Sequence, residues 1–422
     1  MLYRAIFLLA AAALGMTGCT VAENNEIGSP EDTGIPVSDE YSPTIAIVDW
    51  GAVDLTDPAV VQDFAQADFI VLETAYLLNG RRNAGGIAAI KELNPDVRIV
   101  GYVSAHASWL SWGDPDADLE RSEYYTRDWY EATEPYWSYT TTGDTMCSWP
   151  GKVLLNVLDP DCRAAMVGVL ADHWTAHDNV LDGIFWDHFN HFLWVPNDIE
   201  GVEGLMDLDG DGITHREDED EMAAYRIAVE DLVRRARRAL GNDVIQIANG
   251  QRAPADSNFA ALLDGMFYED FPAYNYTGEK MRQALDREVP NNLFAAHSWC
   301  RTQNGGPWLI LSNWDRFYAP DDDGNVVAWR RSDFNRVVGL LSGCLSVYYP
   351  SASYRYDWPE VELELGLPLA EAVQTGDLVS REFENGTVLL DFGAATGQIP
   401  FGFAIVQNDS LRQRFQYEEE LP

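Results

Sequence analysis

Short apolar runs alternate with amphipathic segments along the chain from residue 44 onward. Turn-forming residues bound the apolar runs, as they do in buried β-strands, whereas the amphipathic segments repeat their apolar residues with the period of an α-helix. This alternation predicts a sheet with helices packed on it. The eight predicted strands span residues 45–50, 69–76, 98–104, 181–189, 244–249, 263–271, 308–314 and 345–349.

Helical patterns separate most of the predicted strands, at residues 57–67, 85–93, 161–177, 219–240 and 332–343. Strands that are apolar throughout and alternate with helices indicate a parallel sheet that is buried on both faces. Eight such units over about 300 residues fit a (β/α)8 TIM barrel, an α/β fold, with long loop insertions. A doubly wound open sheet is the alternative, but no glycine-rich phosphate loop follows the first strand.

Two regions depart from this alternation. Residues 107–152 are rich in aromatic side chains and have no clear period, which favours a long functional loop. Residues 378–408 contain short strand-like runs that predict a small C-terminal β appendage. We therefore expect a catalytic barrel over residues 44–355 and a C-terminal extension with short strands over residues 356–422.

The N-terminus, residues 1–19, is typical of a lipoprotein signal peptide. The apolar run from Ile6 to Leu14 is too short to span a bilayer, and small residues precede Cys19. We expect cleavage before Cys19 and lipidation of its thiol, which would make the protein extracytoplasmic; an ordinary secretory signal with an incidental cysteine is the alternative. Residues 20–43 lack any apolar period and predict a flexible acidic linker.

The net charge limits the possible partners, and the cysteine count bears on whether disulfides form. The chain has a formal net charge of −40 at pH 7, so nucleic acid and anionic membrane surfaces would repel its body. With Cys19 set aside, four cysteines remain, and an even number outside the cytoplasm suggests up to two disulfides. Pairing of sequence neighbours, Cys147 with Cys162 and Cys300 with Cys344, is one of three possible connectivities. Free buried thiols are the alternative.

One phrase occurs twice, in the fourth and sixth predicted strands. Residues 181–189 read Leu-Asp-Gly-Ile-Phe-Trp-Asp-His-Phe, and residues 263–271 read Leu-Asp-Gly-Met-Phe-Tyr-Glu-Asp-Phe. The match places Asp187 and Glu269 at equivalent positions near the carboxyl ends of two strands, where barrel enzymes hold their active sites. Glycoside cleavage needs two facing carboxyl groups, one to protonate the leaving oxygen and one to attack the anomeric carbon or activate water.

Asp187 and Glu269 are therefore the predicted catalytic pair. We favour Asp187 as nucleophile or base and Glu269 as acid, and the sequence leaves this assignment and the choice between retention and inversion open. Flanking aromatic residues could raise the pKa of one carboxyl group by desolvation. For each carboxylate alone, a helix N-cap is the alternative. Asp182 and Asp264, at the strand entries, are interpreted as turn residues.

Polar and aromatic residues at the other strand ends suggest a substrate site around the same rim. Flat aromatic rings stack on sugar faces, and Trp50, Trp194 and Trp314 follow three of the strands; core packing is the alternative. His188 and Asp270 neighbour the catalytic pair, although strand alternation could turn them toward the helices. The candidate substrate-binding residues are Asp49, Trp50, Glu73, His106, His188, Trp194, Asn249, Asp270, Asn313, Trp314 and Tyr349.

Several short motifs follow one another in a characteristic order, at residues 149–151, 154–160, 181–187, 263–269 and 383–390. In this order they resemble hypothetical glycosyl hydrolase family fifteen, and they are similar to the endo-α-1,4-polygalactosaminidase group. The resemblance covers most of residues 44–392. It implies a TIM barrel with a catalytic Asp on strand four and an acidic catalytic residue on strand six, which correspond to Asp187 and Glu269, and it implies no particular substrate.

The insertion after the fourth strand, at about residues 195–220, contains a D-x-D-x-D-G loop that is typical of Ca²⁺ sites. Gly212 permits the tight turn, and Asp218 stands at the twelfth position, where an EF-hand usually has Glu. We predict a structural Ca²⁺ that rigidifies the insertion near the active-site mouth, and no organic cofactor; a solvated acidic loop is the alternative. The predicted ligands are Asp207, Asp209, Asp211, the carbonyl of Ile213 and Asp218.

The leading hypothesis is a glycoside hydrolase that cleaves an extracellular polysaccharide or oligosaccharide with two carboxylates. The second is a non-catalytic glycan-binding surface lipoprotein on the same scaffold. A metal-dependent hydrolase is disfavoured, because strands one, five and seven lack the His ligands that such sites require. We expect the protein to be a monomer and its partner to be a carbohydrate. We expect it to contact the membrane only through its lipid anchor and to bind no nucleic acid.

Overall fold

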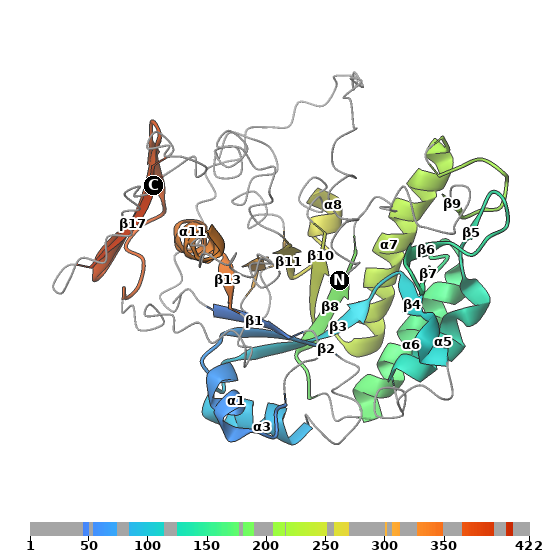
Figure 1. Cartoon of the computed structure of the whole chain (residues 1–422), viewed down its shortest axis with the longest axis horizontal. Helices are drawn as coiled ribbons and strands as arrows, with labels where there is room; N and C mark the ends of the chain where they lie inside the picture. The colour runs from blue at the N-terminus through green and yellow to red at the C-terminus, as the bar shows by residue number, and fades with distance from the viewer. Residues whose placement is uncertain are drawn as a thin grey trace.

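A computed structural model describes the chain as a parallel barrel with helices around it and a separate antiparallel sheet at one side (Figure 1). Residues 1–44, which include the predicted signal peptide, Cys19 and the linker, lie outside the described part. The described residues are 45–49, 54–73, 84–113, 125–176, 180–189, 206–215, 217–250, 257–269, 300–301, 306–312, 327–348, 365–391 and 402–407.

Eight parallel strands close into a barrel in the order β1-β13-β12-β11-β10-β8-β3-β2. This closure confirms the predicted TIM barrel and excludes the open sheet. Each predicted strand is present. The barrel strands are β1 (Ile45–Asp49), β2 (Phe69–Glu73), β3 (Arg98–Ser104), β8 (Gly183–Asp187), β10 (Ile245–Asn249), β11 (Gly265–Tyr268), β12 (Trp308–Leu311) and β13 (Leu345–Tyr348).

Helices follow the strands and cover the outside of the barrel (Figure 1). The predicted start at Asp57 is confirmed: its side chain accepts a hydrogen bond from the Ala59 N–H at 2.9 Å, with Pro58 at the first helical position. Helix α7 begins after Asp218, which caps it in the same way. The helices around the barrel are α1 (Pro58–Phe64), α3 (Ala84–Leu93), α6 (Pro160–Ala176), α7 (Glu219–Leu240), α8 (Ser257–Ala260) and α11 (Val327–Ser342).

Strand alternation divides the core into two layers. In β8, Phe185 packs in the barrel interior with Val71, Val100 and Phe267. Ile184 and Trp186, on either side of Phe185, belong to the layer between sheet and helices. Because every second side chain of each strand points inward, the residue two positions after an interior side chain is directed toward the barrel mouth.

The amino ends of three barrel strands carry the same hydrogen-bonded aspartate. The Asp182 N–H donates to the Ile99 carbonyl at 2.7 Å, and the Ile99 N–H donates back to Asp182 Oδ2 at 2.8 Å. This reciprocal pair fixes the entry of β8 against β3. The same pair joins Asp264 to Gln246 and Asp68 to Ile45.

Gly183 and Gly265 follow two of these aspartates, at points where the neighbouring strand comes very close. A Cβ at Gly183 would lie 2.2 Å from the Ile245 carbonyl oxygen, and one at Gly265 would lie 1.9 Å from the Trp308 carbonyl oxygen. Both distances are far below van der Waals contact, so the repeated Leu-Asp-Gly phrase is explained by barrel closure.

The described parts of the 107–152 insertion, residues 107–113 and 125–152, form short strands and helices, so the prediction of a long loop is wrong for them. Trp129 is completely buried and donates its indole N–H to the Ala107 carbonyl at 3.2 Å. The helices and strands of this insertion are too short for a hydrophobic period to be recognised in the sequence. They are β4 (Ala107–Trp109), η1 (Leu110–Gly113), α5 (Tyr125–Thr133), η2 (Glu134–Tyr136), β5 (Tyr139–Thr140), β6 (Cys147–Trp149) and β7 (Lys152–Leu154).

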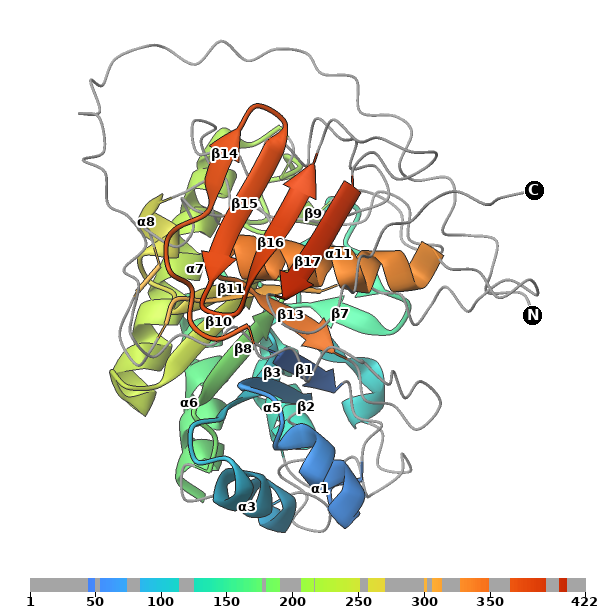
Figure 2. The same cartoon turned by 90° about the vertical axis from the view of Figure 1, so that its left-hand side faces the viewer.

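The C-terminal strands form an antiparallel sheet that lies over α11 (Figure 2). Arg381, which is 3% exposed, joins the two by donating to the Leu340 carbonyl of α11 at 3.0 Å. The sheet therefore packs on the barrel. Its strands are β14 (Val373–Thr375), β15 (Leu378–Phe383), β16 (Gly386–Asp391) and β17 (Gly402–Gln407).

All four described cysteines, Cys147, Cys162, Cys300 and Cys344, are free thiols, so the suggested disulfides are not formed. Three of them are buried within different parts of the core, where Cys162, for example, contacts Met166 with 3.9 Å between the sulfurs. Burial raises the pKa of each of these three thiols to about 12. Among the described residues, no helix has the length and apolar character needed to cross a membrane.

Candidate active site

Asp187 and Glu269 lie at the carboxyl ends of two strands that flank β10. Asp187 is the last residue of β8 and is 6% exposed, and Glu269 directly follows β11 and is half-buried. Phe185 and Phe267, two positions earlier in each strand, belong to the interior layer. Alternation therefore directs both carboxylates toward the mouth of the barrel.

Asn249, the last residue of β10, bridges the two carboxylates. Its Nδ2 donates to Asp187 Oδ1 at 2.9 Å and to Glu269 Oε2 at 2.8 Å. The two oxygens are therefore separated by no more than about 5.7 Å, the sum of the two distances. One amide group thus holds both predicted catalytic carboxylates within reach of a single small reacting centre.

The second oxygen of Asp187 faces a hydroxyl group and two nitrogen groups. The Tyr102 hydroxyl donates to Oδ2 at 2.5 Å, His188 Nε2 lies 3.5 Å from Oδ2, and Lys152 Nζ lies 3.9 Å from it. Together with Asn249, these groups come from β3, β7, β10 and the residue after β8.

The groups around Asp187 favour its ionised form. Burial opposes ionisation, but positive charge at His188 and Lys152 and the hydrogen bonds from Tyr102 and Asn249 outweigh it, so the pKa of Asp187 lies below its ordinary value. Burial and the charge of Asp187 raise the pKa of Tyr102 well above its ordinary value, which keeps the phenol protonated as a donor. Asp187 is therefore a carboxylate across the neutral pH range.

Lys152 reaches the barrel mouth from the insertion. It is the first residue of β7, it is 3% exposed, and its Nζ lies 5.7 Å from the centroid of the Trp109 ring on the neighbouring strand β4. A buried ammonium group needs an anion or an aromatic face nearby, and here it has both. The insertion after β3 thus contributes the cation next to Asp187.

Two histidines lie beside this cluster. His188 has a φ of +52°, so it leaves strand geometry and its side chain turns toward Asp187 and not toward the helices. The rings of His106 and His188 meet edge to face, with 5.6 Å between centroids. Burial, followed by the charges of His188 and Lys152, lowers the pKa of His106 to about 3, and burial also lowers the pKa of His188.

The structure brings together some of the predicted rim residues but not all. Asn249, His106, His188 and Glu73 lie around Asp187; Glu73 shares the inward face of β2 with interior Val71, and its negative charge acts on Tyr102. Asp49 lies on the opposite face of β1 from the interior residues, toward the helix layer. Trp50, Trp194, Asp270, Asn313, Trp314 and Tyr349 lie outside the described residues.

Sequence reasoning missed Tyr102 and Lys152. Tyr102 stands two positions after interior Val100 in a predicted strand, so alternation could have identified it as a mouth residue. Lys152 lies in the insertion without a recognisable period, and its proximity to Asp187 depends on the sheet that pairs β7 with β4 and β6. No local pattern pointed to it.

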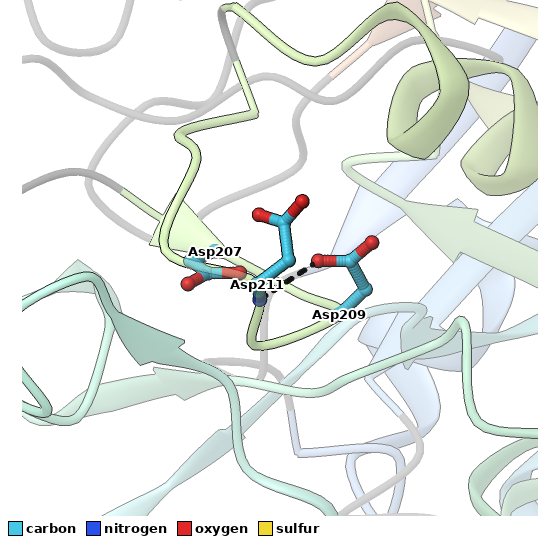
Figure 3. Close-up of side chains that lie close together, drawn as sticks. All are labelled: Asp207, Asp209 and Asp211. Atoms are coloured by element: carbon cyan, nitrogen blue, oxygen red, sulfur yellow. Dashed lines mark hydrogen bonds between the residues drawn. The ribbon is translucent and has the colours of Figure 1, made fainter.

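A second group of carboxylates lies in the predicted calcium loop, after strand β9 (Met206–Asp207). Carboxylate oxygens of Asp207, Asp209 and Asp211 lie within 4.8 Å of one another (Figure 3). Those of Asp209, Asp218 and Glu221 also lie within 4.8 Å of one another. Within the described residues, the groups of His, Cys, Asp or Glu that could converge on a metal ion are these two.

Solved structures of glycosidases match this chain at low sequence identity. An α-galactosidase of family GH36 from Geobacillus stearothermophilus, in complex with stachyose, is 10% identical with a TM-score of 0.46, over 83% of this chain and 47% of that one. A cyclic α-maltosyl-(1→6)-maltose hydrolase from Arthrobacter globiformis is 12% identical with a TM-score of 0.42, over 87% and 92%. The chain thus spans about half the length of the α-galactosidase. No curated protein sequence matches.

The family model described as hypothetical glycosyl hydrolase family 15 matches residues 91–387. The matched segment includes both copies of the repeated phrase, the insertion that carries Lys152 and the acidic loop. This match confirms the family resemblance of the sequence motifs, and the chain belongs to hypothetical glycosyl hydrolase family 15.

Proposed function

We propose that this protein is a retaining glycoside hydrolase that cleaves an extracellular polysaccharide or oligosaccharide, with Asp187 as nucleophile and Glu269 as acid and base. The observation that carries the proposal is the bridge from Asn249, which limits the separation of Asp187 Oδ1 and Glu269 Oε2 to about 5.7 Å. Carboxyl groups are about 5–5.5 Å apart in retaining enzymes and about 6.5–9.5 Å apart in inverting ones. The upper limit of about 5.7 Å lies close to the retaining range and below the inverting range, which supports retention.

The environment of Asp187 supports its role as the nucleophile. A nucleophile must be ionised, and the groups around Asp187 lower its pKa. Asp187 would attack the anomeric carbon while Glu269 gives its proton to the departing glycosidic oxygen. Water would then attack the glycosyl ester, give a proton to Glu269 and release Asp187 as a carboxylate.

The substrate is best sought with a panel of polysaccharides and oligosaccharides that includes amino-sugar polymers. Release of reducing ends from at least one of them is expected from the wild-type protein and not from Asp187→Asn. A preparation of wild type that releases no reducing ends from any member, while it still binds one of them, would favour the second hypothesis. In that case the chain is a glycan-binding lipoprotein, and Asp187→Asn leaves the affinity unchanged.

Stereochemistry tests the mechanism separately from the substrate. With any cleaved substrate, proton NMR of the first product anomer should show the configuration of the substrate. The opposite anomer would contradict the retaining assignment while leaving the glycosidase assignment intact.

For localisation we propose an extracytoplasmic protein held to the membrane through lipidated Cys19. This proposal is supported by the apolar run and the small residues before Cys19. Mass spectrometry of the mature N-terminus should find a diacylated Cys19, and Cys19→Ala should abolish fractionation with the membrane. An unmodified N-terminus that begins elsewhere would indicate an ordinary secretory signal.

A further inference from the structure

Glu221, in the first turn of α7, was not among the residues that the sequence pointed to. It is 2% exposed, its Oε1 accepts a hydrogen bond from the Leu208 N–H at 2.8 Å, and its Oε2 is buried with no hydrogen-bond partner. A buried carboxylate oxygen without a partner is costly. A carboxylate oxygen of Glu221 lies within 4.8 Å of oxygens of Asp209 and Asp218, so this side chain faces the acidic loop.

The oxygens of this loop have the spacing of a cation shell. Within each of the two groups they lie within 4.8 Å of one another, and two oxygens on opposite sides of a Ca²⁺ ion lie about 4.6–5.2 Å apart, twice the Ca–O distance. Asp209 belongs to both groups, so the two groups adjoin at one carboxylate. Among the described residues, no Lys or Arg forms an ion pair with any of them.

The amide groups of the loop are arranged around the first aspartate. The N–H groups of Gly210 and Gly212 donate to Asp207 at 2.7 and 2.9 Å, and both glycines have positive φ angles of 77° and 88°. The Ile213 N–H donates to Asp211 at 2.7 Å. These bonds fix the orientation of the carboxylates of Asp207 and Asp211 while leaving lone pairs for a ligand.

We propose that this loop is a Ca²⁺ site that Glu221 completes from helix α7. Its ligands are the carboxylates of Asp207, Asp209, Asp211, Asp218 and Glu221 and the carbonyl of Ile213. Glu221 thus supplies, three residues later and from within the helix, the glutamate that the twelfth position lacks. Six or more oxygen ligands of mixed geometry suit Ca²⁺, whereas Mg²⁺ prefers a near-ideal octahedron that keeps several waters.

The ion would connect elements that belong to two different insertions. Strand β9 pairs with β5 of the insertion that also carries Lys152, and Asn156 of the same segment donates to the Leu208 carbonyl at 2.7 Å. Binding of Ca²⁺ therefore fixes the start of α7 against both. The site does not depend on the proposed glycosidase activity.

The test is calorimetric titration of the metal-stripped full-length protein with CaCl2. Wild type should bind one Ca²⁺, and Glu221→Gln, which keeps the acceptor for Leu208, should weaken binding about tenfold or more because one charged ligand is lost. Glu219→Gln is the matched control. It removes the same charge from the same helical turn, at an exposed position outside both groups, and it should bind Ca²⁺ like wild type.

Thermal unfolding provides the second measurement. Added Ca²⁺ should raise the Tm of wild type and Glu219→Gln and have a much smaller effect on Glu221→Gln. Absence of binding to wild type at millimolar CaCl2, or an affinity of Glu221→Gln within twofold of wild type, would overturn the proposal. If Glu221→Gln does not fold, Asp209→Asn at an exposed position common to both groups replaces it, with the same expectations.

Discussion

Strands β8 and β11 each carry an acidic residue at both ends, and the partners of these residues differ between the two ends. At the entry, Asp182 and Asp264 accept hydrogen bonds from the backbone of the preceding strand and pair with cations of the surrounding helices, Lys91 at 3.0 Å and Arg237 at 2.7 Å. At the exit, Asp187 and Glu269 share an amide donor and face groups from several other elements.

The difference lies in where the partners come from. The partners of the entry aspartates belong to elements adjacent in the barrel, so these carboxylates stabilise the packing of strand on strand and helix on sheet. The partners of Asp187, in particular Tyr102, Asn249 and Lys152, come from separate strands and an insertion, and they converge on one point. Barrel enzymes generally use the carboxyl ends of strands for activity and the amino ends for stability, and the following predictions test that division.

The largest effect is expected from Asp187→Asn. The change removes the proposed nucleophile and leaves a side chain of the same shape that Tyr102 and Asn249 can still contact, so kcat should fall by about 10³-fold or more. Tm should also fall, because Lys152 loses its buried counter-ion, but the protein should still fold. Steady-state kinetics on a substrate from the panel and thermal unfolding measure both. Asp182→Asn, at the other end of the same strand, is the control and should keep kcat within about twofold. An Asp187→Asn protein with near-normal kcat would remove Asp187 from the catalytic pair.

Glu269→Gln should have the next largest effect, and one that depends on the leaving group. Loss of the general acid lowers kcat by about 10²–10⁴-fold for natural substrates, whose leaving oxygen must be protonated. Aryl glycosides with acidic phenols need no proton in the first step, so cleavage of that bond should be affected much less. Equal losses for both substrate types, measured by kinetics of the first turnover, would contradict the role of Glu269 as acid.

Lys152→Met should change the pH dependence more than the maximal rate. Lys152 lowers the pKa of Asp187, and activity requires ionised Asp187, so activity is present above this pKa and lost as the pH falls through it. Without the ammonium group the pKa of Asp187 rises, so the acidic limb of kcat/KM should move to higher pH. Lys91→Met, which removes the cation next to Asp182, should leave this limb in place. Coincident limbs for wild type and Lys152→Met would mean that Lys152 does not act on Asp187.

The barrel and the positions of the two candidate carboxylates could be predicted because each depends on a short, repeated pattern. Eight apolar runs gave the strands, and the doubled phrase gave Asp187 and Glu269. Tyr102 was in a predicted strand, but its contact with Asp187 depends on the register of β3 against β8. Lys152 and Glu221 could not be found, because each is brought to its site by tertiary packing, of β7 on β4 and of α7 on the acidic loop.

The smallest effects on activity, with measurable effects on stability, are expected at the strand entries. The side chain of Asp264 is fully buried and that of Asp182 is 25% exposed. Asp264→Asn leaves Arg237 without its buried counter-ion and should lower the free energy of unfolding by about 3 kcal/mol, whereas Asp182→Asn loses a more exposed pair and should cost about 1 kcal/mol. Urea denaturation measures both values.

Both entry variants should keep the wild-type kcat at temperatures where they are folded, because neither aspartate contacts the carboxyl ends of the strands. Asp68 forms the same reciprocal pair with Ile45 at the entry of β2. It extends the comparison to a strand that carries neither of the two proposed catalytic residues. Asp68→Asn should therefore also affect stability alone. A selective loss of kcat in any of the three, with the stability of the fold intact, would show that the two ends of the barrel are coupled and that the division of roles is incomplete.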